Sequence, residues 1–308
     1  MKQLKTIAIL GAVLIPSVSF AERTGVVPRV SMGYSEYNFN QSGRTGAITR
    51  DAQGNLLATP LDFPSVDFDV NFFMYSVGAT FFKGNKYLDL SYQTSSTESD
   101  TFDADLFGGY SESLSGDRTD YSITAGMKVK VGSLKSKMGV YVGYKVGKSS
   151  ATGVLSDATA SNFGNTNATM LSFKEDGPFF GVNYGWRLGK GLISANIAYA
   201  FLSGKLIEEN TKFEGTQQTN LNAKSKAHGV SYGIGWNAKF FGGASYSIAV
   251  DTNSYTFKDV SDSFGHASPS TVPNPPSKFK EDFLTLKFSI SKVFFLAFRS
   301  EEHTSELQ

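Results

Sequence analysis

The chain has 308 residues, of which 40% are hydrophobic and 14% aromatic, and its formal net charge is +1. This size allows one large domain or two small ones, and a charge near zero without a basic cluster gives no reason to expect a nucleic-acid partner. Because cysteine is absent, disulfides, thiolate metal sites, cysteine nucleophiles and a lipid anchor on cysteine are excluded.

The first 21 residues have the pattern of a cleaved signal peptide. Lys2 and Lys5 precede an apolar run over residues 6–18, and Ser19-Phe20-Ala21 places small residues at the positions that a signal peptidase reads. The run is too short for a membrane-spanning helix, and Pro16 interrupts it. We therefore expect cleavage after residue 21 and export of the mature chain.

From residue 29 onward the chain repeats one pattern, in which a stretch of alternating apolar and polar residues is followed by a turn or a loop. Such alternation predicts a β-strand with one apolar face. The clearest stretches are 121–131, 138–147, 180–188, 193–201 and 230–240, and the less regular ones are 29–39, 69–82, 87–94, 244–254 and 282–295. The sequence therefore predicts about ten strands.

The connections between these stretches alternate in length. Short glycine-rich connections at 83–86, 132–135, 189–191 and 241–243 predict tight hairpin turns. The connections near 40–68, 95–119, 148–176, 203–227 and 255–280 are long and polar. An even-stranded membrane barrel has this arrangement, with short periplasmic turns and long extracellular loops. We therefore predict an all-β fold over residues 22–298: a transmembrane, antiparallel, up-and-down barrel in the outer membrane, with five long extracellular loops.

Aromatic residues are expected to form girdles at the two membrane interfaces of such a barrel. The candidates near the short turns are Trp186, Trp236, Phe240 and Tyr246, and those near the long loops are Phe179, Tyr255 and Phe257. Lysines also gather at the short turns, and we interpret them as a solvated rim: Lys83, Lys86, Lys135, Lys137 and Lys190.

The last predicted strand has an apolar row that Lys292 interrupts and that ends on an aromatic residue: Leu284, Leu286, Phe288, Ile290 and Phe294. In this respect it resembles the C-terminal recognition strand of bacterial outer-membrane proteins. The resemblance is generic to small outer-membrane β-barrels. It implies that the barrel-assembly machinery acts on the chain during biogenesis, and that its lasting partners are outer-membrane lipid and lipopolysaccharide. We expect a monomer.

The final segment, residues 299–308, resembles the in-frame translation of a common sequencing adapter, codon by codon. We therefore treat it as an artefact and exclude it, with its His303, from functional reasoning. The natural C-terminus then lies near residues 294–298 or beyond a break in the reading frame.

Ten strands enclose a narrow interior. The predicted inward face carries many glycines and the following charged residues: Asp89, Asp120, Lys128, Lys145, Arg187, Lys239, Asp251 and Lys287. Two interpretations stay open. These charges line a narrow pore for small solutes, or they form a salt-bridge plug that stabilises the wall. The plug is favoured, because few strands leave little lumen.

Two short motifs suggest hydrolysis. His266-Ala267-Ser268 resembles the His-x-Ser of some outer-membrane lipid hydrolases, but the flanking glycine and prolines disfavour a strand there. Asp67-Phe68-Asp69 resembles the paired acids of the omptin proteases, but the matching Asp-x-His is missing and His228 has no acid two residues before it.

No carboxylate–histidine cluster has metal-ligand spacing and no glycine–lysine phosphate loop is present, so we expect neither a metal nor a cofactor. The sequence favours a non-enzymatic outer-membrane barrel with a structural or surface-interaction role, or a narrow pore. The alternative is an outer-membrane hydrolase, a lipid esterase or an omptin-like protease, that uses a loop histidine.

Overall fold

The computed structural model describes residues 23–42, 45–47, 60–62, 66–96, 98–104, 110–130, 136–156, 167–211, 217–262 and 278–296. The predicted signal peptide over residues 1–21 and the adapter-like segment over 299–308 lie outside these ranges. Within them, no helix is both long enough and apolar enough to cross a membrane.

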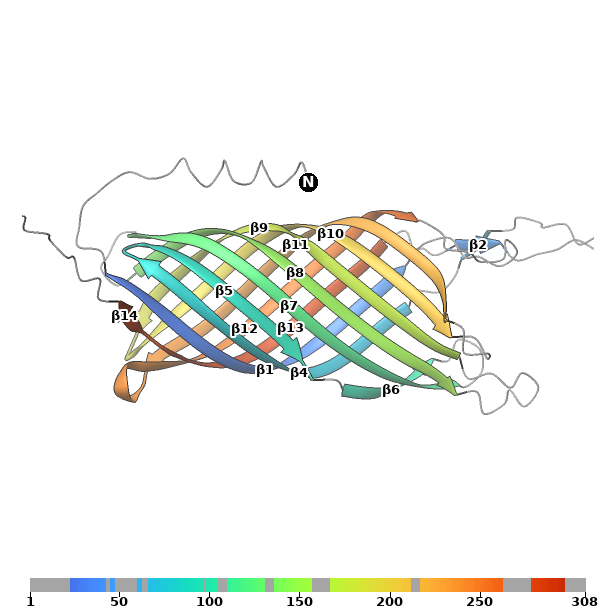
Figure 1. Cartoon of the computed structure of the whole chain (residues 1–308), viewed down its shortest axis with the longest axis horizontal. Coiled ribbons are helices and arrows are strands. Elements are labelled where there is room, and N and C mark those ends of the chain that lie inside the picture. The colour runs from blue at the N-terminus through green and yellow to red at the C-terminus, as the bar shows by residue number, and fades with distance from the viewer. Residues whose placement is uncertain are drawn as a thin grey trace, which may run out of the picture.

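Ten long strands form one closed antiparallel barrel, which confirms the predicted fold class (Figure 1). Each strand pairs with its neighbours in chain order, and β13 pairs with β1 from Arg29–Ser291 to Ser42–Lys278, which closes the ring. The strands are β1 (Thr24–Ser42), β4 (Val66–Lys83), β5 (Lys86–Ser95), β7 (Tyr110–Lys130), β8 (Ser136–Ser156), β9 (Asn167–Leu188), β10 (Gly191–Thr211), β11 (Gln217–Lys239), β12 (Ala244–Asp262) and β13 (Lys278–Lys292).

Short elements complete the sheet. β6 (Glu98–Ala104) pairs with β7 beyond the end of β5, and β14 (Phe294–Leu296) pairs with β1 beyond the end of β13. β2 (Thr45–Ala47) and β3 (Pro60–Asp62) pair only with each other. The 3₁₀ turn η1 (Phe241–Gly243) joins β11 to β12.

Tight turns gather at one end of the barrel, on the left in Figure 1, which we call the turn end; the opposite end is the far end. Gly84 and Gly189 each begin a two-residue turn with φ of 59°, and Gly242 and Gly243 have φ of 69° and 79°. Left-handed backbone of this kind is the reason that these turns require glycine. The three turns match the sequence prediction, and the fourth, over 132–135, lies outside the described residues.

The strands extend further toward the far end than the sequence indicated. β8 continues to Ser156, β9 begins at Asn167 and β11 begins at Gln217. The predicted loops at 95–119, 148–176 and 203–227 are therefore largely strand. The loop at 40–68 loses its ends to β1 and β4, and the loop at 255–280 loses its ends to β12 and β13. These loop boundaries were wrong.

The cause of the error is a change of phase in the alternation: the apolar residues face outward in the middle of a strand and inward toward its far end. In the middle of β9 the outward residues are apolar, as Phe180 and Val182 show with exposures of 51% and 38%. Toward the far end of the same strand, the inward Phe173 is buried and the outward Lys174 is exposed. The outer face there lies beyond the hydrocarbon of the membrane, so polar residues face outward and apolar residues face inward.

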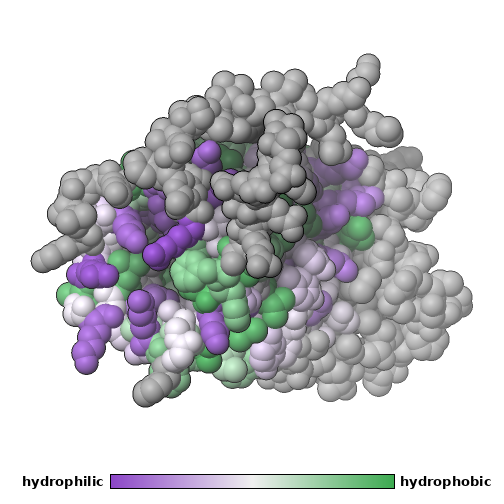
Figure 2. Space-filling view, turned by 60° about the vertical axis from the view of Figure 1, so that its left-hand side comes forward, coloured by the Kyte–Doolittle hydropathy of each residue, from purple (hydrophilic) through white to green (hydrophobic). Residues whose placement is uncertain are grey.

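Exposed apolar side chains form a belt around the outside of the barrel, and all ten strands contribute to it. Examples are Met32, Val77, Leu90, Ile123, Val142, Val182, Ile197, Ile234, Val250 and Leu286. Figure 2 shows such residues, in green, on the outer surface beside hydrophilic ones. A continuous apolar surface of this kind is unfavourable in water, at about 25 cal/mol per Å². The belt is therefore the surface that meets the hydrocarbon of a membrane.

The longest strands exceed the membrane. β11 has 23 residues, whereas a tilted strand needs only about 9–11 residues to cross the hydrocarbon. The barrel therefore projects beyond the belt at its far end, where its interior has to be stabilised by protein contacts alone.

Candidate functional site

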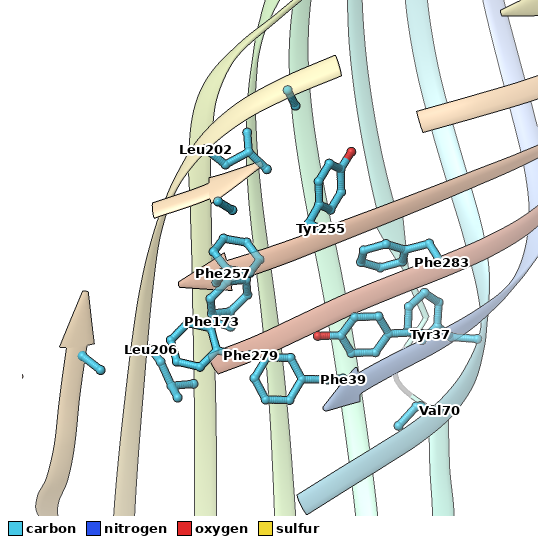
Figure 3. Packing of buried hydrophobic residues seen from close by; sticks show 14 of the residues in the cluster. Tyr37, Phe39, Val70, Phe173, Leu202, Leu206, Tyr255, Phe257, Phe279 and Phe283 are labelled. Carbon is cyan, nitrogen blue, oxygen red and sulfur yellow. The ribbon is translucent and has the colours of Figure 1, made fainter. Parts of the chain in front are cut away.

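Buried hydrophobic side chains fill the bore toward the far end (Figure 3). Phe257 and Phe279 retain no exposed surface. We call this cluster the aromatic core, and its members are Tyr37, Phe39, Val70, Phe72, Met74, Phe173, Ala200, Leu202, Leu206, Ala223, Ala227, Tyr255, Phe257, Phe279 and Phe283.

One contact of the aromatic core crosses the whole bore. The rings of Phe39 on β1 and Phe173 on β9 lie 5.7 Å apart between centroids. β1 and β9 face each other across the barrel, since four strands separate them on either side: β8, β7, β5 and β4 on one, and β10 to β13 on the other. The rings of Phe173 and Phe257 are nearly perpendicular, with 4.8 Å between their centroids. Aromatic rings from opposite walls thus meet in the middle.

A buried ion network lies against the aromatic core, with Arg118 of β7 at its centre. Arg118 is 3% exposed, and its Nη2 donates to Asp120 Oδ1 and to Glu175 Oε1, each at 2.7 Å. Its Nη1 donates to Glu281 Oε1 at 3.0 Å. Lys145 Nζ lies 2.6 Å from Glu175 Oε1. Every charge in this network has an opposite charge as a neighbour, which is the condition for keeping such groups inside a protein.

The ion network makes a second contact across the bore, in addition to that of the aromatic core. Ser149 Oγ on β8 donates to Glu281 Oε1 on β13 at 3.3 Å, and these two strands also face each other across the barrel. Tyr37 donates its hydroxyl to the same oxygen at 3.0 Å. The guanidinium of Arg118 lies 4.0 Å from the ring centre of Phe283, a cation–π contact that joins the network to the aromatic core.

Gly147 on β8 provides the space for this network. A methyl group at that position would lie 2.7 Å from both Arg118 Nη2 and Glu175 Oε1 and 2.8 Å from Asp120 Oδ1. Any side chain larger than hydrogen would therefore push apart the groups that the network brings together.

Two polar cavities follow between the ion network and the turn end. The first, of about 270 Å³, is lined by Arg118, Lys145 and polar residues of several strands, including Asn196 and Tyr141. The second, of about 540 Å³, shares Tyr141 and Asn196 with the first and reaches Lys128 near the turn end. The interior is therefore hollow and polar in one half and filled in the other.

The structure pairs most of the charges that the sequence placed inside. Asp120 and Lys145 belong to the ion network. Asp89 accepts from both guanidinium nitrogens of Arg29, at 2.5 and 2.7 Å, and also from the Thr80 hydroxyl. Asp251 pairs with Lys287 at 3.4 Å. The remaining three lie toward the turn end: Lys128 lines the second cavity, and Arg187 and Lys239 are exposed.

Sequence reasoning missed the centre of the network. Arg118 and Glu175 fell inside predicted loops, and Glu281 fell just before a predicted strand. The signal that would have found them is parity, because Arg118 is two residues from the inward Asp120 and Glu281 is two from the inward Phe283. Extending each strand in steps of two would have placed both residues inside the barrel.

Part of the predicted aromatic girdle was wrong. Tyr255 and Phe257 are 2% and 0% exposed inside the barrel, and Phe179 packs against the aromatic core. They were assigned outward because the phase of alternation changes before them. Near the turn end, Trp236 and Phe240 contact Tyr246 at ring distances of 5.5 and 6.4 Å, and Trp186 contacts Tyr184 at 5.8 Å.

The residues suggested for hydrolysis do not come together in the described ranges. His228 faces outward on β11, where it contacts Tyr199 and Phe201. Asp67 and Asp69 lie in β4, opposite Asn40 and Asn38 of β1. His266-Ala267-Ser268 lies outside the described residues. In the part of the chain that is described, no group of three or more His, Asp or Glu side chains is arranged to hold a metal ion.

Comparison with known proteins supports the fold. No protein-family model matches the sequence, and no curated protein matches it. Among solved structures, the barrel is similar to the outer membrane protease OmpT from Escherichia coli, with a TM-score of 0.60 at 10% identity over 90% of this chain and 99% of OmpT. The translocator domain of the autotransporter NalP from Neisseria meningitidis is more distant, with a TM-score of 0.37 at 8% identity over 94% and 93% of the two chains.

A closed ten-stranded barrel with an apolar belt on its outer surface, and with the fold of OmpT, defines an integral outer-membrane β-barrel protein. At this level of identity the likeness extends to the fold alone.

Proposed function

We propose that this protein is a sealed outer-membrane barrel without enzymatic activity, which serves a structural or surface-interaction role rather than conducting small solutes. The observation that carries the proposal is the double crossing of the bore, by the Phe39–Phe173 contact and by the Ser149–Glu281 hydrogen bond. A pore needs a continuous passage, and at these two levels side chains of opposite walls are in contact.

The free space within the aromatic core supports the same proposal. The cavity lined by Tyr37, Phe39, Phe72 and Phe173, among others, measures about 30 Å³, which is room for one or two water molecules. The linings of the two polar cavities described above include none of the rings of Phe39, Phe173 and Phe279. Water can enter the hollow half of the barrel, but a solute would have to separate buried aromatic rings to leave it.

Planar-bilayer recording tests the proposal directly. The refolded barrel should give no current steps at high salt. The variant that carries alanine at Phe39, Phe173 and Glu281 should give steps, since it removes a side chain from each of the two contacts across the bore. Regular steps from the unmodified barrel would overturn the proposal.

A matched control excludes leakage caused by loss of aromatic residues in general. Phe180 and Phe288 are exposed on the outer belt, so the double alanine variant at these positions removes two aromatic rings without opening the bore. It should stay silent. Heat-modifiable migration on SDS gels should show that each variant is folded before it is recorded.

The competing proposal is a hydrolase that uses His266 and Ser268, or an acid–histidine pair. The outward, aromatic surroundings of His228 favour a non-enzymatic barrel. The test is hydrolysis of phospholipid esters and of peptides by the purified barrel. We expect none, and hydrolysis that disappears in His266→Ala, Ser268→Ala or His228→Ala would establish an enzyme instead.

A further inference from the structure

Four lysines lie side by side on four consecutive strands of the outer wall. The register places Lys148 of β8 directly opposite Lys174 of β9. Lys174 lies opposite Lys205 of β10, which in turn lies opposite Lys224 of β11. We call these residues the lysine row.

All four side chains point away from the bore. Lys148, Lys174 and Lys224 are exposed, whereas the residues on either side of each are buried. Lys205 is half-buried and lies between the buried Gly204 and Leu206. The row is therefore a feature of the outer surface and takes no part in the ion network inside the barrel.

An aromatic edge lies below the row, on the side of the apolar belt. Phe180 contacts Tyr199 at a ring distance of 6.0 Å, and Phe201 contacts Tyr199 and His228 at 5.1 and 5.4 Å. Aromatic rings of this kind mark the level at which hydrocarbon gives way to lipid head groups. None of these residues is among those that the sequence named for the girdle near the long loops, which were Phe179, Tyr255 and Phe257.

The spacing puts the lysines at head-group height. Lys205 follows Phe201 by four residues, and Lys224 precedes His228 by four. At about 3.3 Å per residue and a tilt of about 45°, four residues rise by roughly 9 Å. A lysine side chain is long enough to extend back over part of that height.

The lysines lack opposite charges of their own. Among the residues that the structure describes, no carboxylate forms an ion pair with any of the four, whereas nearby Lys280 pairs with Asp282 at 2.6 Å. The neighbouring Asp176 accepts a hydrogen bond from Tyr144. Like charges directly opposite each other on adjacent strands destabilise a sheet, so an anion that bridges them would stabilise this wall.

Further lysines continue the row around the barrel. Lys226 lies opposite Lys258 of β12, and Lys278 and Lys280 follow on β13, where Lys280 is opposite Thr256. The positive surface thus extends from β8 to β13, always beyond the apolar belt.

From this geometry we infer that the lysine row binds the phosphate groups of phosphorylated lipids in the leaflet at the far end of the barrel. Phosphate has the charge and the acceptor oxygens that several ammonium groups can share. A lipid also brings its acyl chains against the belt directly below, which a free phosphate ion does not. This inference concerns the outer wall and stands independently of whether the bore is sealed.

The test measures lipid binding by the refolded full-length barrel. The variant carries glutamine at Lys148, Lys174, Lys205 and Lys224. Its matched control carries glutamine at four exposed lysines of the turn end: Lys83, Lys86, Lys190 and Lys239. Both variants lose the same charge, and heat-modifiable migration verifies folding. The probe is bisphosphorylated lipid A in detergent micelles, with dephosphorylated lipid A and inorganic phosphate as separate arms.

We expect the apparent affinity for phosphorylated lipid A to fall by about tenfold or more in the lysine-row variant, since each lysine near an anionic surface contributes to binding. The control variant should bind like the unmodified barrel, and neither dephosphorylated lipid A nor inorganic phosphate should bind measurably. Equal losses in both variants, no loss in either, or binding of inorganic phosphate at the same affinity would each overturn the assignment.

Discussion

The two halves of the bore use charged residues in different ways. At the far end, Arg118 is 3% exposed, and Glu175 and Glu281, which it contacts, are fully buried. Toward the turn end, Arg29 and Asp89 also form a close pair, at 2.5 Å, but their side chains are 28% and 19% exposed. Water that reaches a pair can solvate either partner alone, so exposed pairs contribute little. A buried charge whose partner is removed is not solvated by water, so the loss of stability is large. The comparison teaches that charged pairs contribute more to stability in the filled, far-end half of this barrel than in the hollow half.

The largest effect should follow from Arg118→Ala. It leaves the two buried glutamates without their common cation, so we expect a loss of about 3–5 kcal/mol in the free energy of unfolding. Urea unfolding in detergent micelles measures it. Arg29→Ala is the matched control in the other half, with an expected loss of about 1 kcal/mol or less.

A second variant sharpens this result. In the Arg118→Ala background, changing Glu281 to glutamine removes the carboxylate that has lost its cation, whereas Glu175 keeps Lys145 at 2.6 Å, so part of the lost stability should return. If Arg29→Ala proved as costly as Arg118→Ala, or if the glutamine restored nothing, the two halves would not differ as described.

Phe279→Ala should rank next. The ring is fully buried and contacts Phe39, Phe173 and Phe257. Removing it leaves a cavity among rigid neighbours, for which about 3–5 kcal/mol is usual. Phe288→Ala on the outer belt, where the ring is 41% exposed, removes the same atoms next to fluid lipid and should cost clearly less in the same unfolding experiment.

Gly147→Ala should have the smallest effect of the three, about 1–3 kcal/mol, because a methyl group there displaces members of the ion network. Gly185→Ala is its control. At Gly185 on β9 the nearest atoms to an added methyl group would be 3.5 Å away, an ordinary contact, so the thermal midpoint should hardly change. Equal shifts for both glycines would show that the space at Gly147 does not matter.

The sequence predicted the membrane-spanning part of the barrel well. Within the belt, rows such as Val230, Tyr232 and Ile234 face lipid while Ser231 and Gly233 face the bore, and this alternation identified each strand. The tight turns followed from their glycines. Both signals are local, because lipid on one side and backbone geometry at a turn act on each residue directly.

The candidate site could be predicted only in part. Asp120 and Lys145 lie next to belt residues and were placed inside correctly, but Arg118 and Glu175 lie beyond the belt, in segments that were interpreted as loops. There the lysines face outward and the apolar residues face inward. The rule that apolar positions face outward, which identified the strands within the belt, therefore fails beyond it. The contacts across the bore join strands far apart in the sequence, such as β8 and β13. No local pattern indicates which of the inward residues will meet.

The change of phase along strands such as β9 has a further consequence for the depth at which the molecule sits in the membrane. At the far end, the outward lysines and the aromatic rings at the edge of the belt fix the hydrophobic thickness of the wall. A bilayer with a thicker hydrocarbon layer would have to thin around the barrel or draw ammonium groups toward its interior, at a fraction of a kcal/mol per Å of mismatch. Refolding yield should therefore pass through an optimum as acyl chains are lengthened, with the position of the optimum set by the distance between the two polar edges of the wall.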